Sequence, residues 1–293
     1  MKWGIVFSST GFPDPDAAVA LALAAEQAGF ESLWAPEHVI ESVAPDATPY
    51  RGVPSGSMRR LSSRGGIPDP LIWFAYVASA TSTIRFGTGV LILPEHQPTV
   101  FAKTAATLDH LSGGRLMLGV GVGELPEEYA AVGMEFTNRG RRMDEAIDAI
   151  RVLWRDEVAT FSGEHVRFDQ VECRPWPVNG SIPFIIGGAS KAAIRRAATR
   201  GDGYFPFVFP DQDVRVEMPR LIREVKDATE AAGRPRDALE LTAGGARTLE
   251  DAKWFADLGV GRLTVAVRAR SIADMQQEVA RLGEELVAPS ADL

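Results

Sequence analysis

The sequence predicts an α/β fold, a single (β/α)8 TIM barrel with insertion loops that spans residues 1–293 as one domain. Short apolar runs rich in β-prone residues alternate with helical segments, which is the pattern of βαβ units in a parallel sheet. The chain has no Gly/Ser/Pro-rich linker that would divide it into two halves. Because such barrels typically need about 250 residues, the remaining length is expected in inserted loops.

The first unit shows how the alternation is recognised. Residues 3–7 form a short apolar run of β-prone residues, and residues 13–16 (PDPD) end it and supply a helix N-cap. Residues 17–28 are rich in Ala, Leu and Glu, and Gly29 follows them as a C-cap. Since the next apolar run begins only a few residues later, at 32–34, a strand–helix–strand unit is expected.

The same alternation continues to the end of the chain. Further strands are predicted at residues 84–91, 115–122, 183–186, 202–206, 239–244 and 262–267. Further helices are predicted at residues 71–81, 99–111, 137–154, 190–199, 214–232, 249–258 and 272–286. The weakest of the eight strands is 202–206, while the helix at 137–154 carries an apolar face. That face consists of Met143, Ile147, Ile150 and Trp154.

Two segments interrupt the alternation. Residues 40–70 contain five Pro, four Gly and five Ser, and they are too long for an ordinary connector. They follow the second strand, so in a barrel they lie on the carboxyl face as a lid; a disordered insertion is the alternative. The candidate substrate contacts in the lid are Tyr50, Arg51, Arg59 and Arg60. For each Arg, the alternative is a solvated charge on the surface. Residues 158–168 are expected to form a small hairpin.

Composition excludes several classes of function. The net charge of −8 and the absence of a basic run argue against nucleic-acid binding, and no apolar run is long enough to span a membrane. The single cysteine, Cys173, forms no internal disulfide, which fits the cytoplasm. His96, His110 and His165 lack ligand spacing, so no metal site is expected. The sequence also contains no Gly-x-Ser-x-Gly elbow, which argues against a serine hydrolase.

Glycines gather at the end of the predicted strand 115–122. The run Gly119-Val120-Gly121-Val122-Gly123-Glu124 is not a dinucleotide fingerprint, since Glu124 takes the place of a third glycine. Glycine there lets a flat ligand approach the main chain, so Val122 and Gly123 are candidate cofactor contacts; a crowded barrel rim is the alternative. Glu124 is a candidate acid or base, or else a solvated carboxylate.

A second glycine-rich turn joins a strand to a helix. It consists of Gly187, Gly188, Ala189 and Ser190. Backbone N–H groups at a helix N-terminus suit a phosphate, so these four residues are candidate cofactor contacts. Lys191, Arg195 and Arg196 follow and are expected to add positive charge; a plain βα turn is the alternative.

Glu37 and His38 follow the strand at 32–34 and should lie on the same carboxyl face. Histidine is the side chain best suited to proton transfer near neutral pH. His38 is therefore a candidate catalytic residue, and a structural histidine is the alternative.

Several motifs together resemble the luciferase-like monooxygenase superfamily. The most specific is TLDHLSGGRLMLGVGVG at residues 107–123, supported by residues 86–98, 139–145 and the turn at 187–190. The resemblance covers most of residues 1–210, and the carboxyl third matches loosely. Within the superfamily the chain is most similar to oxidoreductases that depend on coenzyme F420.

The resemblance implies a barrel with an isoalloxazine or deazaflavin ring in its carboxyl mouth. It places Glu37 and His38 beside the ring, and a non-proline cis peptide at Gly89-Val90 behind it. Glu124 would face the substrate as a second acid or base, and the turn at 187–190 would hold phosphate.

Two departures limit the resemblance. Glu127 stands where the sugar-phosphate dehydrogenases of this family have Asn. The carboxyl third has no clear match for their substrate-phosphate lysines and arginine. Oxidation of a sugar phosphate is therefore not expected.

These observations lead to three functional hypotheses. The first is an F420-dependent oxidoreductase that transfers a hydride between the deazaflavin and an unidentified small organic substrate. The second is an FMN-dependent monooxygenase that uses reduced flavin and O2. The third is a non-catalytic cofactor-binding barrel. The resemblance further implies a homodimer.

Overall fold

A computed structural model describes residues 1–40, 42, 48, 66–208 and 212–293. Most of the predicted lid, 40–70, therefore lies outside the described residues. The same holds for its four candidate substrate contacts, Tyr50, Arg51, Arg59 and Arg60.

The parallel sheet closes into a barrel, as predicted. Its strands are β1 (Lys2–Val6), β2 (Ser32–Ala35), β3 (Arg85–Thr88), β5 (Leu116–Gly121), β8 (Phe184–Gly187), β9 (Gly203–Phe205), β10 (Glu240–Gly244) and β11 (Arg262–Ala266). Neighbouring strands pair in parallel, and the β1–β11 and β3–β5 pairs complete the ring. The weakest predicted strand, 202–206, is β9.

The predicted strand at 84–91 is interrupted. It consists of β3 and the short β4 (Leu91–Ile92), which also pairs with β5. Gly89 and Val90 lie between the two strands.

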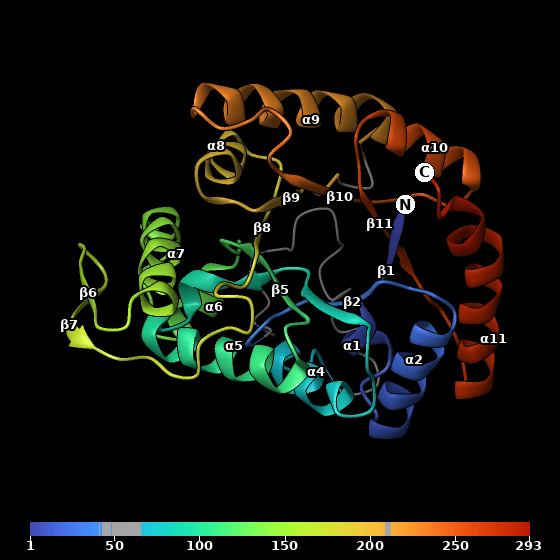
Figure 1. The fold of residues 1–293 in the computed structure, drawn as a ribbon, viewed down its shortest axis with the longest axis horizontal. Helices are drawn as coiled ribbons and strands as arrows, with labels where there is room; N and C mark the ends of the chain where they lie inside the picture. Colours follow the sequence, from blue (N-terminus) through green and yellow to red (C-terminus); the bar gives the residue numbers. More distant parts are fainter. Residues whose placement is uncertain (41, 43–47, 49–65, 209–211) are drawn as a thin grey trace.

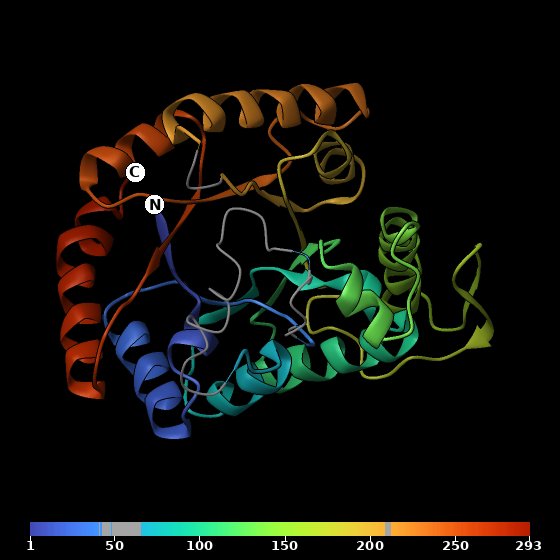
Figure 2. The same ribbon diagram turned by 180° about the vertical axis from the view of Figure 1, so that it is seen from behind.

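Helices surround the barrel on its outer side (Figures 1 and 2). They are α2 (Pro15–Gln27), α4 (Pro70–Ala78), α5 (Pro98–Ser112), α7 (Arg139–Arg155), α8 (Lys191–Arg200), α9 (Val214–Ala231), α10 (Leu249–Asp257) and α11 (Ile272–Leu282). In the described part of the chain, none of them is long and apolar enough to cross a membrane. The chain ends meet, since the N-terminal ammonium donates to the Ser290 carbonyl oxygen at 2.8 Å.

Several short elements extend the predicted pattern. Two single turns, α1 (Ser8–Gly11) and η1 (Leu93–Glu95), and the helix α6 (Pro126–Ala131) follow strands. The chain closes with the turns η2 (Gly283–Val287) and η3 (Ala288–Ser290). The predicted hairpin consists of the antiparallel strands β6 (Ala159–Ser162) and β7 (Arg167–Val171), and it projects from the body of the molecule (Figure 1).

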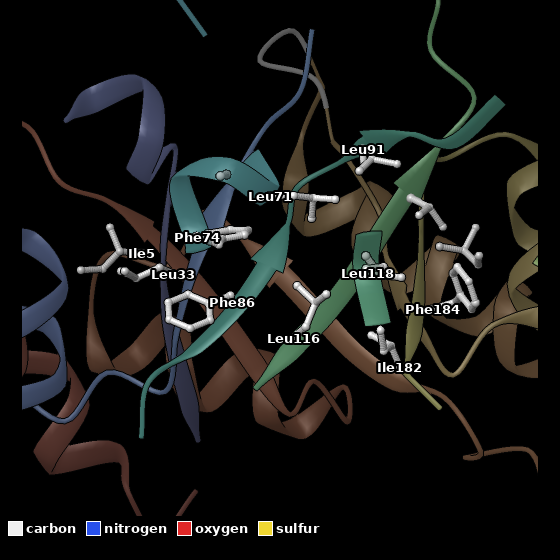
Figure 3. Close-up of a cluster of buried hydrophobic side chains, with 14 of the residues drawn as sticks. Ile5, Leu33, Leu71, Phe74, Phe86, Leu91, Leu116, Leu118, Ile182 and Phe184 are labelled. Atoms are coloured by element: carbon white, nitrogen blue, oxygen red, sulfur yellow. The ribbon is translucent and has the colours of Figure 1, made fainter. Parts of the chain in front are cut away.

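The outer core lies between the strands and the helices. Ile5, Leu33, Phe86 and Phe184 alternate along their strands with inward-facing residues and are fully buried (Figure 3). They pack with helix residues such as Phe74 of α4, whose ring centroid is 5.3 Å from that of Phe86. The alternation of strand residues thus forms one apolar layer outside the sheet.

A second, smaller core fills the barrel interior around Trp34. The indole is fully buried with Met117 and Ile185, and the Phe205 ring meets it edge-on at 5.4 Å. A Cβ atom on Gly4 or Gly87 would lie only 2.6 Å from the indole. Glycine at these inward positions therefore makes room for one large aromatic side chain.

Charged residues close the end of the barrel where the strands begin. Arg262 at the start of β11 is fully buried, and its guanidinium donates to Glu31 at 2.8 Å and to Glu240 at 2.9 Å. Two carboxylates thus compensate one buried cation. Because this end is closed, ligands are expected at the opposite, carboxyl end.

Candidate active site

The predicted site residues meet at the carboxyl ends of the strands, because all eight strands of the barrel run in the same direction. Glu37 and His38 follow β2, Gly89 and Val90 follow β3, and the predicted segment that ends in Glu124 follows β5. The turn at 187–190 begins at the last residue of β8. The structure therefore brings these predicted positions to one rim.

Val90 forms the floor of this mouth. The Gly89–Val90 peptide bond is cis, and the Gly89 N–H donates to the Ala35 carbonyl at 2.8 Å. A Cβ on Gly121 would come within 2.8 Å of a Val90 methyl, and one on Gly187 within 2.5 Å of the other. These strand-end glycines thus make space for Val90, which stays partly exposed. A small apolar surface results, backed by main chain.

The Glu37 carboxylate is buried, and each of its oxygens has a hydrogen-bond partner. Its Oε2 accepts from the Ile92 N–H at 2.7 Å, and its Oε1 lies 3.0 Å from His96 Nε2. Burial alone would lower the pKa of His96, but the hydrogen bond and charge of Glu37, with a contribution from Asp69, raise it. Glu37 therefore ties the end of β2 to the η1 region, and its contact with a cofactor stays a prediction.

His38 is held by a second buried carboxylate, Glu128 of α6. His38 Nδ1 lies 2.9 Å from Glu128 Oε2, and the side chains are 12% and 1% exposed. Glu128 Oε1 also accepts from the Val39 N–H at 2.5 Å. A carboxylate on Nδ1 fixes the orientation of an imidazole and stabilises its protonated form. The pair thus has the chemistry that an acid–base group requires.

Sequence reasoning missed Glu128 as well as His96 and Glu95. Pro126 followed by two acidic residues is a typical helix start and could have indicated α6, but not its partner 90 positions earlier in the chain. Glu95 is buried, and neither of its carboxyl oxygens has a hydrogen-bond partner among the described residues. Burial, followed by the charges of Glu128 and Glu37, raises the pKa of Glu95 to about 8.

The segment after β5 is hydrogen-bonded to α6. The Tyr129 hydroxyl donates to the Val122 carbonyl at 2.7 Å. Gly123 has a φ of +60°, and a Cβ there would lie 2.8 Å from Ile92. Glu124 is partly buried at this rim. A cofactor contact from this segment and an acid–base role for Glu124 stay predictions.

The neighbouring Glu127 has a structural partner. Its Oε1 accepts from the N–H and the hydroxyl of Thr48 at 2.8 and 2.9 Å. These hydrogen bonds lower its pKa. Glu127 of α6 thus binds Thr48.

The turn at 187–190 already makes hydrogen bonds within the protein. Gly188 adopts φ +109°, and its N–H donates to the Phe205 carbonyl at 3.3 Å. The Ser190 hydroxyl caps α8 by accepting from the Ala193 N–H at 3.2 Å. The binding of phosphate here stays a prediction.

The structure corrects the expectation for Arg196. Its side chain is buried, and its guanidinium donates to Asp144 at 2.5 Å and to the Gly140 carbonyl at 2.9 Å on α7. Arg195 lies 3.6 Å from the same carboxylate. Both arginines thus join α8 to α7 through Asp144. Lys191, at the first position of α8, is exposed.

Metal ligation has no structural basis in the part of the chain that the structure describes. No group of three or more His, Cys, Asp or Glu side chains there is arranged to hold a metal ion. Cys173 is a buried free thiol.

The chain is similar to known proteins over nearly its full length. The model of the luciferase-like monooxygenase family matches residues 2–253. The uncharacterized protein Rv0953c of Mycobacterium tuberculosis is 32% identical over 98% of this chain and 99% of its own. An F420-dependent glucose-6-phosphate dehydrogenase of Kineococcus radiotolerans is 29% identical over 98% of this chain and 80% of its own.

One solved structure has a closely similar fold. Monooxygenase RslO1 from Streptomyces bottropensis, 21% identical, matches with a TM-score of 0.77 over 99% of both chains and therefore shares the fold. The chain belongs to the luciferase-like monooxygenase family.

Proposed function

We propose that this protein is an F420-dependent oxidoreductase that transfers a hydride between the deazaflavin and a small organic substrate. The observation that carries the proposal is the His38–Glu128 pair at 2.9 Å, at the carboxyl mouth of the barrel. The similarity to the Kineococcus enzyme, which its name describes as F420-dependent, supports the choice of cofactor.

The residues at the mouth fit a planar ring. Gly121 and Gly187 carry no side chain, and the Val90 methyl groups fill the space that a Cβ would take. Val90 and the main chain of residues 121–123 therefore offer a flat, partly apolar support. The turn at 187–190 lies at the N-terminus of α8, whose dipole favours the phosphate of such a cofactor.

The chemistry of the bound deazaflavin is hydride donation or acceptance at one ring carbon. The protein binds and orients the ring and manages the proton that accompanies the hydride. His38 holds this proton at Nε2, while the Glu128 carboxylate at Nδ1 fixes the orientation of the ring. Glu124 serves as the second acid–base group on the substrate side. Glu37 acts through His96 and Ile92, as a positioning residue.

The substrate is an apolar or weakly polar molecule rather than a sugar phosphate. Glu127 replaces the expected Asn and binds Thr48. Exposed apolar side chains follow the barrel strands on the carboxyl side: Phe7 after β1, Val39 after β2 and Phe207 after β9.

We further infer that the protein acts in the cytoplasm as a homodimer. The exposed apolar side chains of Ile72 and Tyr76 on α4 support such an assembly.

An FMN-dependent monooxygenase is the second candidate, because the family to which the chain belongs is that of the luciferase-like monooxygenases. The two are separated by oxygen consumption with reduced FMN and with reduced F420, each tested against a panel of apolar acceptors. The proposal predicts acceptor reduction by reduced F420 without oxygen uptake. Oxygen uptake that requires acceptor and reduced FMN would overturn it.

A further inference from the structure

Glu95 is a buried carboxyl group that the proposed mechanism leaves unused. It ends the turn η1 and is 7% exposed. Neither carboxyl oxygen has a hydrogen-bond partner among the described residues. Burying an ionised carboxylate without a partner is costly, so the uncharged acid is the form that suits this position.

The neighbours of Glu95 explain why a charge would be unfavourable there. The carboxylates of Glu37 and Glu128 are near enough for their charges to raise its pKa, in addition to the effect of burial. Each of them already holds a histidine, His96 at 3.0 Å and His38 at 2.9 Å. An uncharged Glu95 therefore lies near two carboxylates that are each already paired with a histidine.

The cations and the phenol near this turn do not neutralise Glu95. The Arg142 guanidinium, from α7, donates to the Pro94 carbonyl at 3.5 Å, and that of Arg139 lies 3.8 Å from the centre of the Phe136 ring. Both arginines lower the pKa of Tyr129, although burial and the charge of Glu95 raise it overall. None of these groups forms a hydrogen bond with Glu95.

We propose that Glu95 is a positioning residue that limits the group formed by Glu37, Glu95 and Glu128 to two negative charges, so that both carboxylate–histidine pairs stay intact when an anionic cofactor binds. The inference rests on the proposed function for the identity of the cofactor. As an uncharged acid, Glu95 fills the space beside two carboxylates without adding a third charge. When it releases its proton to solvent at alkaline pH, the new charge repels the cofactor and makes His96 retain its proton.

Histidine NMR tests the charge coupling in the cofactor-free protein. The chain has four histidines, so His110 and His165 serve as internal controls for His96. In the wild type we expect the His96 signal to show an inflection near pH 8, the range in which Glu95 titrates. Glu95→Gln should abolish it and leave both controls unchanged. Superimposable curves in the two proteins would contradict the inference.

Thermal unfolding gives a second readout. The pKa of Glu95 is about 8 in the folded protein, above the ordinary value of 4.5 expected after unfolding. The folded state therefore binds more protons, and stability is lost as the pH rises from about 4.5 to 8. Glu95→Gln cannot ionise, so its Tm advantage should grow by about 5 °C between pH 5 and pH 8. The exposed control Glu284→Gln should show no such growth. A constant difference between Glu95→Gln and wild type would count against a neutral Glu95.

Cofactor titration completes the test. At pH 9, Glu95→Gln should bind F420 about tenfold more tightly than the wild type, and this advantage should shrink towards pH 6. Equal affinities at pH 9 would contradict the role in cofactor binding. A failure of all variants to bind F420 would instead refute the proposed function, because the NMR and thermal experiments contain no cofactor.

Discussion

Replacing His38 with glutamine is expected to slow hydride transfer about 10²- to 10⁴-fold. Glutamine can still hydrogen bond to the Glu128 carboxylate, but it cannot hold and release a proton. The rate would be measured by anaerobic single-turnover oxidation of reduced F420, with menadione as an apolar acceptor. F420 affinity should stay close to that of the wild type, because the change removes a proton carrier rather than a binding surface.

Two further variants distinguish proton transfer from a general disturbance. His110→Gln alters an exposed histidine at the end of α5 and should retain the wild-type rate. Glu128→Gln keeps the shape at His38 Nδ1 but removes the charge, so the pH–rate profile should shift to lower pH. A wild-type rate in His38→Gln would exclude His38 as the acid–base group.

Substituting Gly119 with alanine is expected to cost about 4 kcal/mol or more of unfolding free energy. A Cβ at this position would lie 1.9 Å from the Thr88 carbonyl oxygen and 3.3 Å from the Trp34 ring. The first contact is with the main chain of β3. This part of β3 is fixed next to Gly119, because the Thr88 hydroxyl donates to the Gly119 carbonyl at 2.7 Å. No rotamer change can relieve it.

Urea denaturation at equilibrium would measure this effect. Gly261→Ala is the matched control, because nothing lies within 4 Å of its added Cβ and the residue is exposed. It should change the unfolding free energy by less than about 0.5 kcal/mol. If Gly119→Ala were as stable as this control, the close packing of β3 against β5 at this level would be wrong.

The periodicity of the sequence predicted most of the fold. Apolar strands followed by capped helices recur at regular spacing, so even the three-residue strand β9 could be placed from its position between two helices. Met143, Ile147, Ile150 and Trp154 are all buried, as their shared helix face predicts. These features depend on local sequence, which is why they could be read from it.

The partners of the site residues could not be predicted in the same way. Sequence position placed Glu37 and His38 at the rim, but their partners His96 and Glu128 lie 59 and 90 positions away. Which carboxylate holds which histidine depends on how α6 and η1 pack. Glu95 reads as an ordinary loop carboxylate until its burial is known. The sequence likewise predicts that Arg196 adds positive charge near the turn at 187–190, because its partner Asp144 lies on a different helix and could not be identified from the sequence.

The proposed cofactor is tested most directly by titrating the purified protein with F420 and with FMN in parallel by calorimetry. F420 is expected to bind with a micromolar or lower Kd, and FMN at least about tenfold more weakly. Tight binding of FMN without measurable binding of F420 would contradict it and favour the monooxygenase.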